Sequence, residues 1–140
     1  MWQNADGIFL SQGKYTVEIL KRFKMLDCKD MDTRMESNLN LLSDASCEKV
    51  DAMMYRRMIG SLMYLTNTRP YILFDVHTLS QFLTDSIHVH LIAAKHLLRY
   101  LKGTMDYGIK YDVNQKSNLN GYVDSNWTEN ATDMNITLGC

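Results

Sequence analysis

The 140-residue sequence has little proline, few cysteines and almost no net charge. Its one proline, Pro70, stands against the roughly seven that average usage would give. The three cysteines are widely spaced and form no C-x-x-C pair, a pattern that fits free thiols better than a zinc site or a disulfide framework. A formal charge of −1 gives no global reason to expect a nucleic-acid or membrane partner.

Long apolar runs and common catalytic motifs are missing as well. No run approaches the ~20 apolar residues of a membrane helix, and the N-terminus has neither the basic start nor the apolar core of a signal peptide. We therefore expect an intracellular protein that is not secreted, in a compartment that the sequence leaves open. The patterns G-x-x-x-x-G-K-[ST], G-x-G-x-x-G, H-E-x-x-H and G-x-S-x-G do not occur.

What is present is an ordinary globular composition, with 46% hydrophobic and 22% charged residues. The charge is unevenly distributed along the chain. Residues 14–34 and 88–110 each carry an excess of basic side chains, whereas residues 112–140 carry one lysine against four acidic side chains. This asymmetry indicates two different pieces, of which the basic ones would lie nearer any polyanion.

Apolar periodicity and turn residues divide the chain into short strands and longer helices. Helices are expected at residues 12–24, 51–66, 70–82 and 86–103, and strands at 7–10, 107–111 and 121–123. Residues 27–51 are polar and aperiodic, which predicts a long exposed connection. The expected fold class is α+β and mainly helical.

Several residues should set the boundaries and contacts of these helices. Ser11 and Asp51 are suited to cap the first and second helices, and Asp85 or Ser86 the fourth. Gly60 lies in the middle of the second helix, where it weakens helix propensity but would let another helix approach closely.

Three cations of the fourth predicted helix share one stripe, because Lys95, Arg99 and Lys102 are spaced i, i+4, i+7. A cationic stripe on a rigid helix can bind a phosphate backbone, since neutralising phosphates releases their counterions. The same pattern is also typical of the solvated face of an amphipathic helix, and the pattern alone favours that interpretation.

Asp124 is the acidic residue whose place, after a short predicted strand, suggests metal chemistry. A divalent metal needs further carboxylates, and none stands clearly beside it, so a surface aspartate is the alternative. His88, His90 and His96 have no carboxylate or cysteine at ligand spacing, which favours a structural role for them.

Four blocks of sequence occur in the order and spacing of one known family. They read G-I-F-L-S-Q-G-K-Y at 7–15, Y-R-R-M-I-G-S-L-M-Y-L-T at 55–66, T-R-P with I-L-F at 68–74, and A-A-K to L-R-Y-L-K-G-T at 93–104. Together they strongly resemble the reverse transcriptase of copia-type LTR retrotransposons. A fifth block, G-Y-V-D-S-N-W at 121–127, resembles the first strand of the family's ribonuclease H domain, where Asp124 matches the first metal-binding aspartate.

The resemblance implies a division of the chain. Residues 1–111 would be the C-terminal part of the reverse transcriptase, with the palm end, the thumb and the connection. Residues 112–119 would be a linker, and residues 120–140 the truncated start of the ribonuclease H domain. The implied fold is a short strand, a helical thumb-like module and strands that open a ribonuclease H-like domain.

The resemblance also bears on catalysis. The family's Y-x-D-D hairpin, which holds the polymerase metals, would lie upstream of Gly7, so we expect no polymerase activity from this chain alone. No cofactor is expected for the chain by itself, whereas the full-length family enzyme uses Mg²⁺. Motif positions have also changed: T-R-P-D reads T-R-P-Y at 68–71 and D-x-D-W reads D-S-N-W at 124–127, which indicates a drifting copy.

The first hypothesis is therefore a fragment of a retrotransposon RNA-directed DNA polymerase, inactive alone. It would bind template–primer or RNA–DNA hybrid weakly through Lys95, Arg99 and Lys102, with the rest of the Pol polyprotein as partner and no membrane. The alternative is a host-adopted, non-catalytic nucleic-acid-binding or interaction module. A Y-x-D-D-coding frame upstream would indicate the polymerase, and cooperative folding of the chain by itself would favour the host module.

Overall fold

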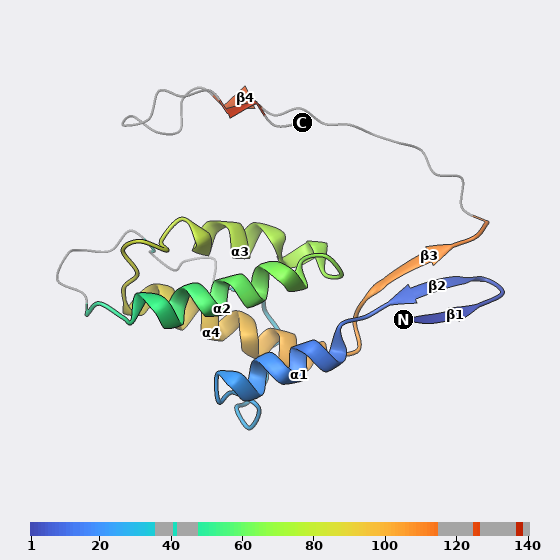
Figure 1. The fold of residues 1–140 in the computed structure, drawn as a ribbon, viewed down its shortest axis with the longest axis horizontal. Coiled ribbons are helices and arrows are strands. Elements are labelled where there is room, and N and C mark those ends of the chain that lie inside the picture. The colour runs from blue at the N-terminus through green and yellow to red at the C-terminus, as the bar shows by residue number, and fades with distance from the viewer. Residues whose placement is uncertain (36–40, 42–47, 115–124, 127–136, 139–140) are drawn as a thin grey trace.

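The structure, a computed structural model, describes residues 1–35, 41, 48–114, 125–126 and 137–138. Figure 1 shows its helices and the strands attached to one end of them. The elements are β1 (Trp2–Asn4), β2 (Gly7–Leu10), α1 (Gly13–Arg22), α2 (Ala52–Leu65), the 3₁₀ turn η1 (Pro70–Ile72), α3 (Leu73–Ser80), α4 (His88–Gly103), β3 (Ile109–Asp112), β4 (Ser125–Asn126) and β5 (Thr137–Leu138). The mainly helical α+β class is confirmed; the strand predicted at 121–123 lies outside the described residues.

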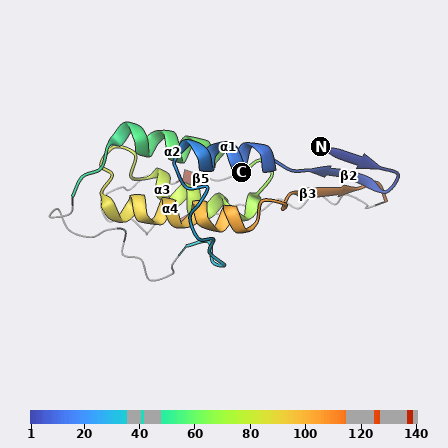
Figure 2. The same ribbon diagram turned by 90° about the horizontal axis from the view of Figure 1, so that it is seen from below.

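Strands β1, β2 and β3 form an antiparallel sheet in that order. The predicted strand at 7–10 is confirmed, and the one predicted at 107–111 is displaced to 109–112. Strand β1 was not predicted, because its exposed residues give no apolar alternation and form a strand by pairing with β2. β3 pairs with β2 from Leu10↔Ile109 to Gly7↔Asp112, so the sheet joins the segment before α1 to the segment after α4. Figures 1 and 2 show it extending away from the helices.

Helix α1 follows from its amphipathic pattern. Thr16, Ile19 and Leu20 are buried on one face, and Lys14 and Glu18 are exposed on the other, as the periodicity predicts. The predicted cap at Ser11 is wrong: the N-cap is Gln12 and makes no side-chain cap. Ser11 lies one residue before the N-cap, and its hydroxyl accepts a hydrogen bond from the Gly13 N–H at 3.3 Å.

Helix α2 begins as its sequence predicts. Asp51 is the N-cap, and its carboxylate accepts the Met53 N–H at 2.9 Å. The helix is fixed to α3 by the buried Tyr55, whose hydroxyl donates to the Leu79 carbonyl oxygen at 2.8 Å. The close helix approach predicted at Gly60 is wrong, since Gly60 is exposed and a Cβ there would meet no atom within 4 Å.

The third predicted helix is present in two parts. Pro70 opens the 3₁₀ turn η1, and α3 follows directly and ends at Ser80. Proline suits a first turn because it has no N–H to leave unpaired there. The sequence thus placed the helix start correctly and its end about two residues too late.

Helix α4 starts later than either predicted cap. Its N-cap is Ile87, in extended backbone conformation, so the prediction of Asp85 or Ser86 is wrong. His90 takes the capping role from inside the helix, since its Nδ1 accepts the Ile87 N–H at 3.1 Å while Nε2 faces the Leu41 carbonyl oxygen at 2.8 Å. A neutral imidazole with its proton on Nε2 satisfies both contacts, which confirms the structural role expected for this histidine.

The four helices enclose one apolar core. Its buried members are Ile19, Leu20, Met25, Tyr55, Met58, Ile59, Leu62, Leu65, Ile72, Val76, Leu79, Leu91, Ala93, Ala94, Leu97, Leu98 and Leu101. All of them belong to the helices, to η1 or to the turn after α1. In the described part of the chain no helix is both long and apolar enough to span a membrane.

A buried arginine links the end of α2 to the turn that leads from α4 toward β3. Arg69, fully buried between α2 and η1, donates to the Thr104 hydroxyl at 3.0 Å and to the Met105 carbonyl oxygen at 3.0 Å, both just after α4. It also donates to the Tyr71 hydroxyl at 3.2 Å. None of the ion pairs among the described residues includes Arg69, so its partners there are backbone and hydroxyl oxygens. Its buried Nε has no hydrogen-bond partner among the described residues.

Candidate nucleic-acid interface

The three predicted cations, Lys95, Arg99 and Lys102, all lie on α4, but they do not share one environment. Lys95 and Arg99 are exposed, whereas Lys102 is half-buried and its ammonium donates to the backbone carbonyl oxygen of Cys28. The structure therefore leaves two of the three side chains open to a ligand in the present conformation.

Lys102 is engaged because the segment after α1 crosses the last turns of α4. The Met31 N–H donates to the Arg99 carbonyl oxygen at 3.4 Å, and His96 Nε2 lies 3.0 Å from the Thr33 carbonyl oxygen. A Cβ on Gly103 would lie 3.4 Å from the Asp30 side chain. The crossing segment thus brings an acidic side chain to the C-terminal end of α4, whereas Lys95 lies nearer the middle of the helix.

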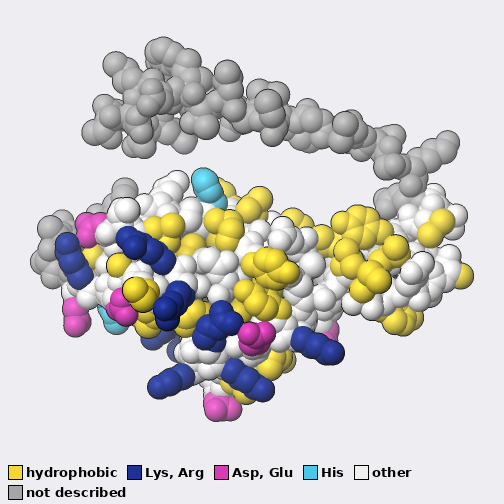
Figure 3. Space-filling view, in the orientation of Figure 1, with side chains coloured by type: hydrophobic (Ala, Val, Ile, Leu, Met, Phe, Trp, Pro, Cys, Tyr) yellow, Lys and Arg dark blue, Asp and Glu magenta, His cyan; other side chains and the backbone are white. Residues whose placement is uncertain are grey.

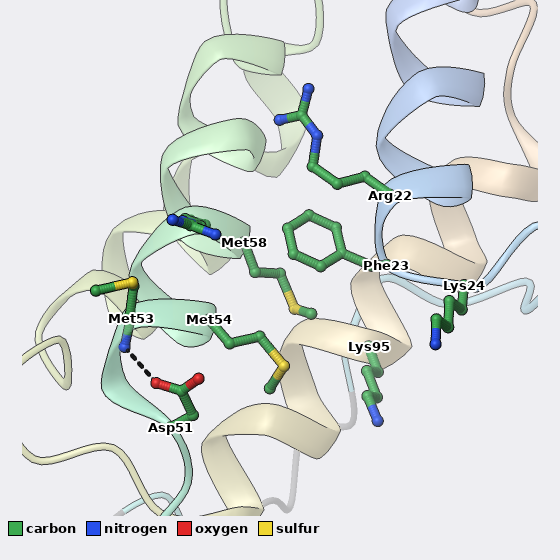
Figure 4. Close-up of a pocket in the computed structure, with 9 residues that line it drawn as sticks. Arg22, Phe23, Lys24, Asp51, Met53, Met54, Met58 and Lys95 are labelled. Carbon is green, nitrogen blue, oxygen red and sulfur yellow. Dashed lines mark hydrogen bonds between the residues drawn. The ribbon is translucent and has the colours of Figure 1, made fainter.

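A surface pocket of about 390 Å³ lies beside Lys95, between α1, α2 and α4. Four of the residues that line it are cations: Arg22 and Lys24 from the end of α1, Arg57 from α2 and Lys95 from α4. Figure 4 shows how side chains from the three helices surround it. Asp51 is the one carboxylate among the lining residues, and its oxygen is occupied by the α2 cap. We call these four residues the cation cluster.

Sequence reasoning missed the cation cluster apart from Lys95. Its members come from segments far apart in the chain, and only the packing of α1 and α2 against α4 brings them together. A weak signal was present, because residues 14–34 carry a local basic excess that includes Arg22 and Lys24. No periodicity, however, connects that segment to Arg57 or to α4.

Lys24 has an unusual backbone conformation, with a φ of 57°. Helix α1 ends in a Schellman motif: the Met25 N–H donates to the Leu20 carbonyl oxygen at 2.7 Å and the Lys24 N–H to the Lys21 carbonyl oxygen at 3.0 Å. The C′ position of this motif is usually glycine, since a side chain in the left-handed region costs about 1 kcal/mol or more. A lysine at this position therefore puts a cation beside the pocket at some cost in stability.

The space-filling view shows how charged side chains are distributed over one face of the molecule (Figure 3). Lys and Arg side chains gather over the helical part of the visible face, whereas the strands carry mainly hydrophobic and uncharged side chains. Glu18 partly offsets this charge through an exposed ion pair with Arg22, N to O 2.9 Å. Exposed pairs of this kind add little stability, so Arg22 can exchange Glu18 for another anion.

A second hollow, of about 280 Å³, lies beside Asp75, Arg34 and Tyr100. Burial raises the pKa of the Asp75 carboxyl, and Arg34, whose Nε lies 3.8 Å from it, opposes that shift. Burial also raises the pKa of the Tyr100 hydroxyl, with a further contribution from the neighbouring Tyr71. Two carboxyl groups, Asp32 and Asp75, and one cation, Arg34, line this hollow, so it has no excess of positive charge.

The predicted metal residue, Asp124, lies outside the described residues. Within the described ranges, no three His, Cys, Asp or Glu side chains come close enough to hold a metal ion together. The Mg²⁺ that the resemblance implies for the full-length enzyme therefore stays an expectation.

Comparison with known proteins identifies relatives of the chain. It is 36% identical over 136 residues to an uncharacterized mitochondrial protein of Arabidopsis thaliana, AtMg00810, and the match covers 97% of this chain and 56% of that protein. It is 36% identical over 134 residues to the retrovirus-related Pol polyprotein from transposon RE2 of Arabidopsis thaliana, covering 96% of this chain. The corresponding polyprotein from transposon TNT 1-94 of Nicotiana tabacum is 33% identical over 139 residues.

The matched segment is only a part of each relative. The chain spans about half the length of the mitochondrial protein, and 9% and 10% of the two polyproteins. No protein-family model matches the chain, and no solved structure matches it. Over nearly its whole length, this chain is homologous to one segment of the retrovirus-related Pol polyproteins of transposons.

Proposed function

We propose that this chain is a Pol polyprotein segment whose role is to hold a nucleic-acid duplex by its phosphate backbone. The homology to transposon Pol polyproteins supports the first half of the proposal. The observation that supports the second half is that Lys95 and Arg99 lie exposed on α4 next to the cation cluster. A template–primer duplex or an RNA–DNA hybrid is the polyanion that such a polyprotein handles.

Backbone binding needs fixed cations more than it needs base contacts. Side chains on packed helices keep their spacing, so each phosphate neutralised releases counterions without a large ordering cost. Lys95 and Arg99 stand one turn apart on α4, which is anchored in the core through Leu97, Leu98 and Leu101. The rigid helix would thus present both cations to successive positions of one strand.

The domain division follows the resemblance. We propose that residues 1–111 are the end of the reverse transcriptase, with palm end, thumb and connection, that 112–119 are a linker and that 120–140 open the ribonuclease H domain. β3 pairs with β2 as far as Asp112, so the described sheet extends one residue past the proposed end of the first part. Catalysis with Mg²⁺ would belong to other parts of a Pol polyprotein, and this chain would be inactive alone.

Charge reversal on α4 tests the proposal. The double variant Lys95→Glu with Arg99→Glu should weaken binding to a short RNA–DNA hybrid and lower the slope of log affinity against log salt by about two, one for each phosphate that is no longer neutralised. Fluorescence anisotropy over a salt series measures both quantities. Lys102 is left unchanged because its bond to the Cys28 carbonyl oxygen supports the fold.

The matched control makes the same change of charge elsewhere. Lys49 and Lys110 are exposed and pair with Asp85 and Asp112, at 3.2 Å and 3.0 Å. Converting both to glutamate alters the net charge by the same amount away from Arg99 and the pocket. The control should keep most of the wild-type salt slope; equal slopes for the α4 variant and wild type would refute backbone binding by α4.

A further inference from the structure

We propose that the pocket between α1, α2 and α4 binds one nucleoside phosphate, with its phosphate on the cation cluster and its base on an apolar floor. The choice of ligand class rests on the proposed nucleic-acid function, but the pocket is a separate site from the Arg99 region of α4. Its volume of about 390 Å³ lies within the range of small-molecule sites.

The cation cluster is suited to a phosphate group. Arg22 and Lys24 line the pocket from the end of α1, Arg57 from α2 and Lys95 from α4. Figure 4 shows Arg22 on one side of the Phe23 ring, and Lys24 and Lys95 on the other. Guanidinium groups bind phosphate oxygens with two parallel N–H contacts, and lysines add compact point charges. Four cations against two carboxylates, Asp51 in the α2 cap and Glu18 paired with Arg22, leave an excess of positive charge for a dianionic phosphate.

The floor of the pocket has a different chemistry. Figure 4 shows the Phe23 ring and the Met54 and Met58 side chains gathered in the same space. Phe23 and Met54 are partly exposed while Met58 is buried, so the floor presents apolar surface to the pocket. Aromatic rings stack on nucleobases, and thioethers contact the faces and edges of planar rings adaptably. Inorganic phosphate would use the rim and leave this floor empty.

Lys24 supplies an independent observation. Its φ of 57° is at the C′ position of a Schellman motif, where glycine would fit without strain. Strained backbone of this kind is concentrated at binding sites, where another function offsets its cost. A purely structural role predicts that Lys24→Gly changes stability alone. A binding role predicts that the same substitution raises stability and weakens ligand binding.

Adenosine 5′-monophosphate, inorganic phosphate and adenosine are the probes. The full chain, labelled at the methionine methyl groups, is titrated with each and followed by NMR. AMP should bind saturably, shift the Met54 and Met58 methyl signals, and bind about tenfold more tightly than phosphate, the advantage that one stacked base gives. Adenosine should bind more weakly than AMP. Equal affinities for AMP and phosphate without methyl shifts would overturn the proposal.

Substitutions then test the cation cluster. Arg57→Gln and Lys95→Gln should each weaken AMP binding about tenfold, the loss expected for one charge-assisted contact. Lys24→Gly should raise the melting temperature and weaken AMP binding severalfold. Lys14→Gln, which removes an exposed cation from the opposite end of α1, is the matched control and should change neither. Unchanged AMP binding in the Arg57, Lys95 and Lys24 variants would overturn the assignment, and the methyl spectra verify that each variant is folded.

A short oligothymidine with a 5′-phosphate or a 5′-hydroxyl identifies the source of the ligand. A preference for the phosphorylated strand over AMP assigns the pocket to a strand end, and equal binding assigns it to a free nucleotide.

Arg99→Gln separates this inference from the proposed function, since it should lower hybrid affinity and leave AMP binding intact. If AMP fails to bind while hybrid binding responds to Arg99, only the pocket assignment falls. If AMP binds while hybrid binding ignores Arg99, only the duplex proposal falls.

Discussion

The helices and the three-stranded sheet are stabilised in different ways. The helical part buries every member of the apolar core among the described residues, whereas β1, β2 and β3 contribute none. The sheet instead exposes aromatic side chains, with Trp2 63% and Tyr111 55% accessible. Backbone hydrogen bonds and a few half-buried residues hold the strands, and β1 presents a free edge in the described structure. The comparison therefore predicts that the helices contribute more to stability than the sheet does.

Deleting core volume should produce the largest effect and a clear asymmetry. Leu97 is completely buried in α4, so Leu97→Ala should lower the free energy of unfolding by about 3 kcal/mol. Phe9 in β2 is half-buried, and Phe9→Ala should cost roughly 1 kcal/mol. Urea denaturation with a constant m-value measures both. Equal losses would mean that the sheet shares the core after all.

The next largest effect should come from removing Arg69, which holds the turn between α4 and β3. Arg69→Ala removes the three hydrogen bonds that Arg69 donates to Thr104, Met105 and Tyr71, and it leaves a cavity. The free energy of unfolding should fall by roughly 2–3 kcal/mol. Arg69→Met keeps the bulk and loses the donors, so it should recover part of that cost.

Hydrogen exchange shows where the Arg69 variants act. Amide protons of β3, which follows the turn that contains Met105, should exchange faster in both variants, before those of α2 or α4 do. Faster exchange throughout the helices, with β3 unaffected, would contradict the role of Arg69 in holding that turn.

Two glycines, one beside the sheet and one in a helix, should respond to substitution by alanine in opposite directions. Gly108 precedes β3, and a Cβ there would lie 2.1 Å from the Leu10 carbonyl oxygen, so Gly108→Ala must move a strand and should cost roughly 1–3 kcal/mol. Gly60 is exposed in the interior of α2 with open space around it, so Gly60→Ala should add about 1 kcal/mol. Thermal unfolding gives both signs. A destabilising Gly60→Ala would restore the predicted helix contact that the structure contradicts.

The sequence predicted features that depend on neighbours in the chain. The cap at Asp51, the start at Pro70 and the buried face of α1 each follow from local chemistry, and the structure has all three. The errors occurred where distant segments decide. The first strand exists only through pairing with β2, and the start of α4 depends on a contact between His90 and Ile87 that caps the helix from inside.

The candidate site shows the same division. Helical spacing correctly placed Lys95, Arg99 and Lys102 on α4, but it could not show that Lys102 is bound to Cys28 from a segment far away in sequence. The cation cluster could not be predicted, since Arg22, Arg57 and Lys95 meet only through packing. Whether these side chains bind nucleic acid stays a prediction for the anisotropy and NMR measurements above.

The smallest expected effect is a pH dependence of stability that comes from Asp75 in the helical part. Asp75 is buried in α3, and burial raises its pKa above the ordinary 3.8, with partial opposition from Arg34. The folded state therefore holds this proton more tightly than the unfolded state. The resulting contribution to stability is present below pH 3.8 and is lost as the pH rises through the raised folded pKa.

Asp75→Asn removes the ionisation, so the melting temperature of the variant should rise relative to wild type across that window and stay higher at neutral pH. Melting temperatures of both proteins from about pH 3 to pH 7 measure the gain, and Asp106→Asn, at an exposed carboxylate, is the matched control. A constant difference between Asp75→Asn and wild type at every pH would mean that packing, not the buried charge, separates them.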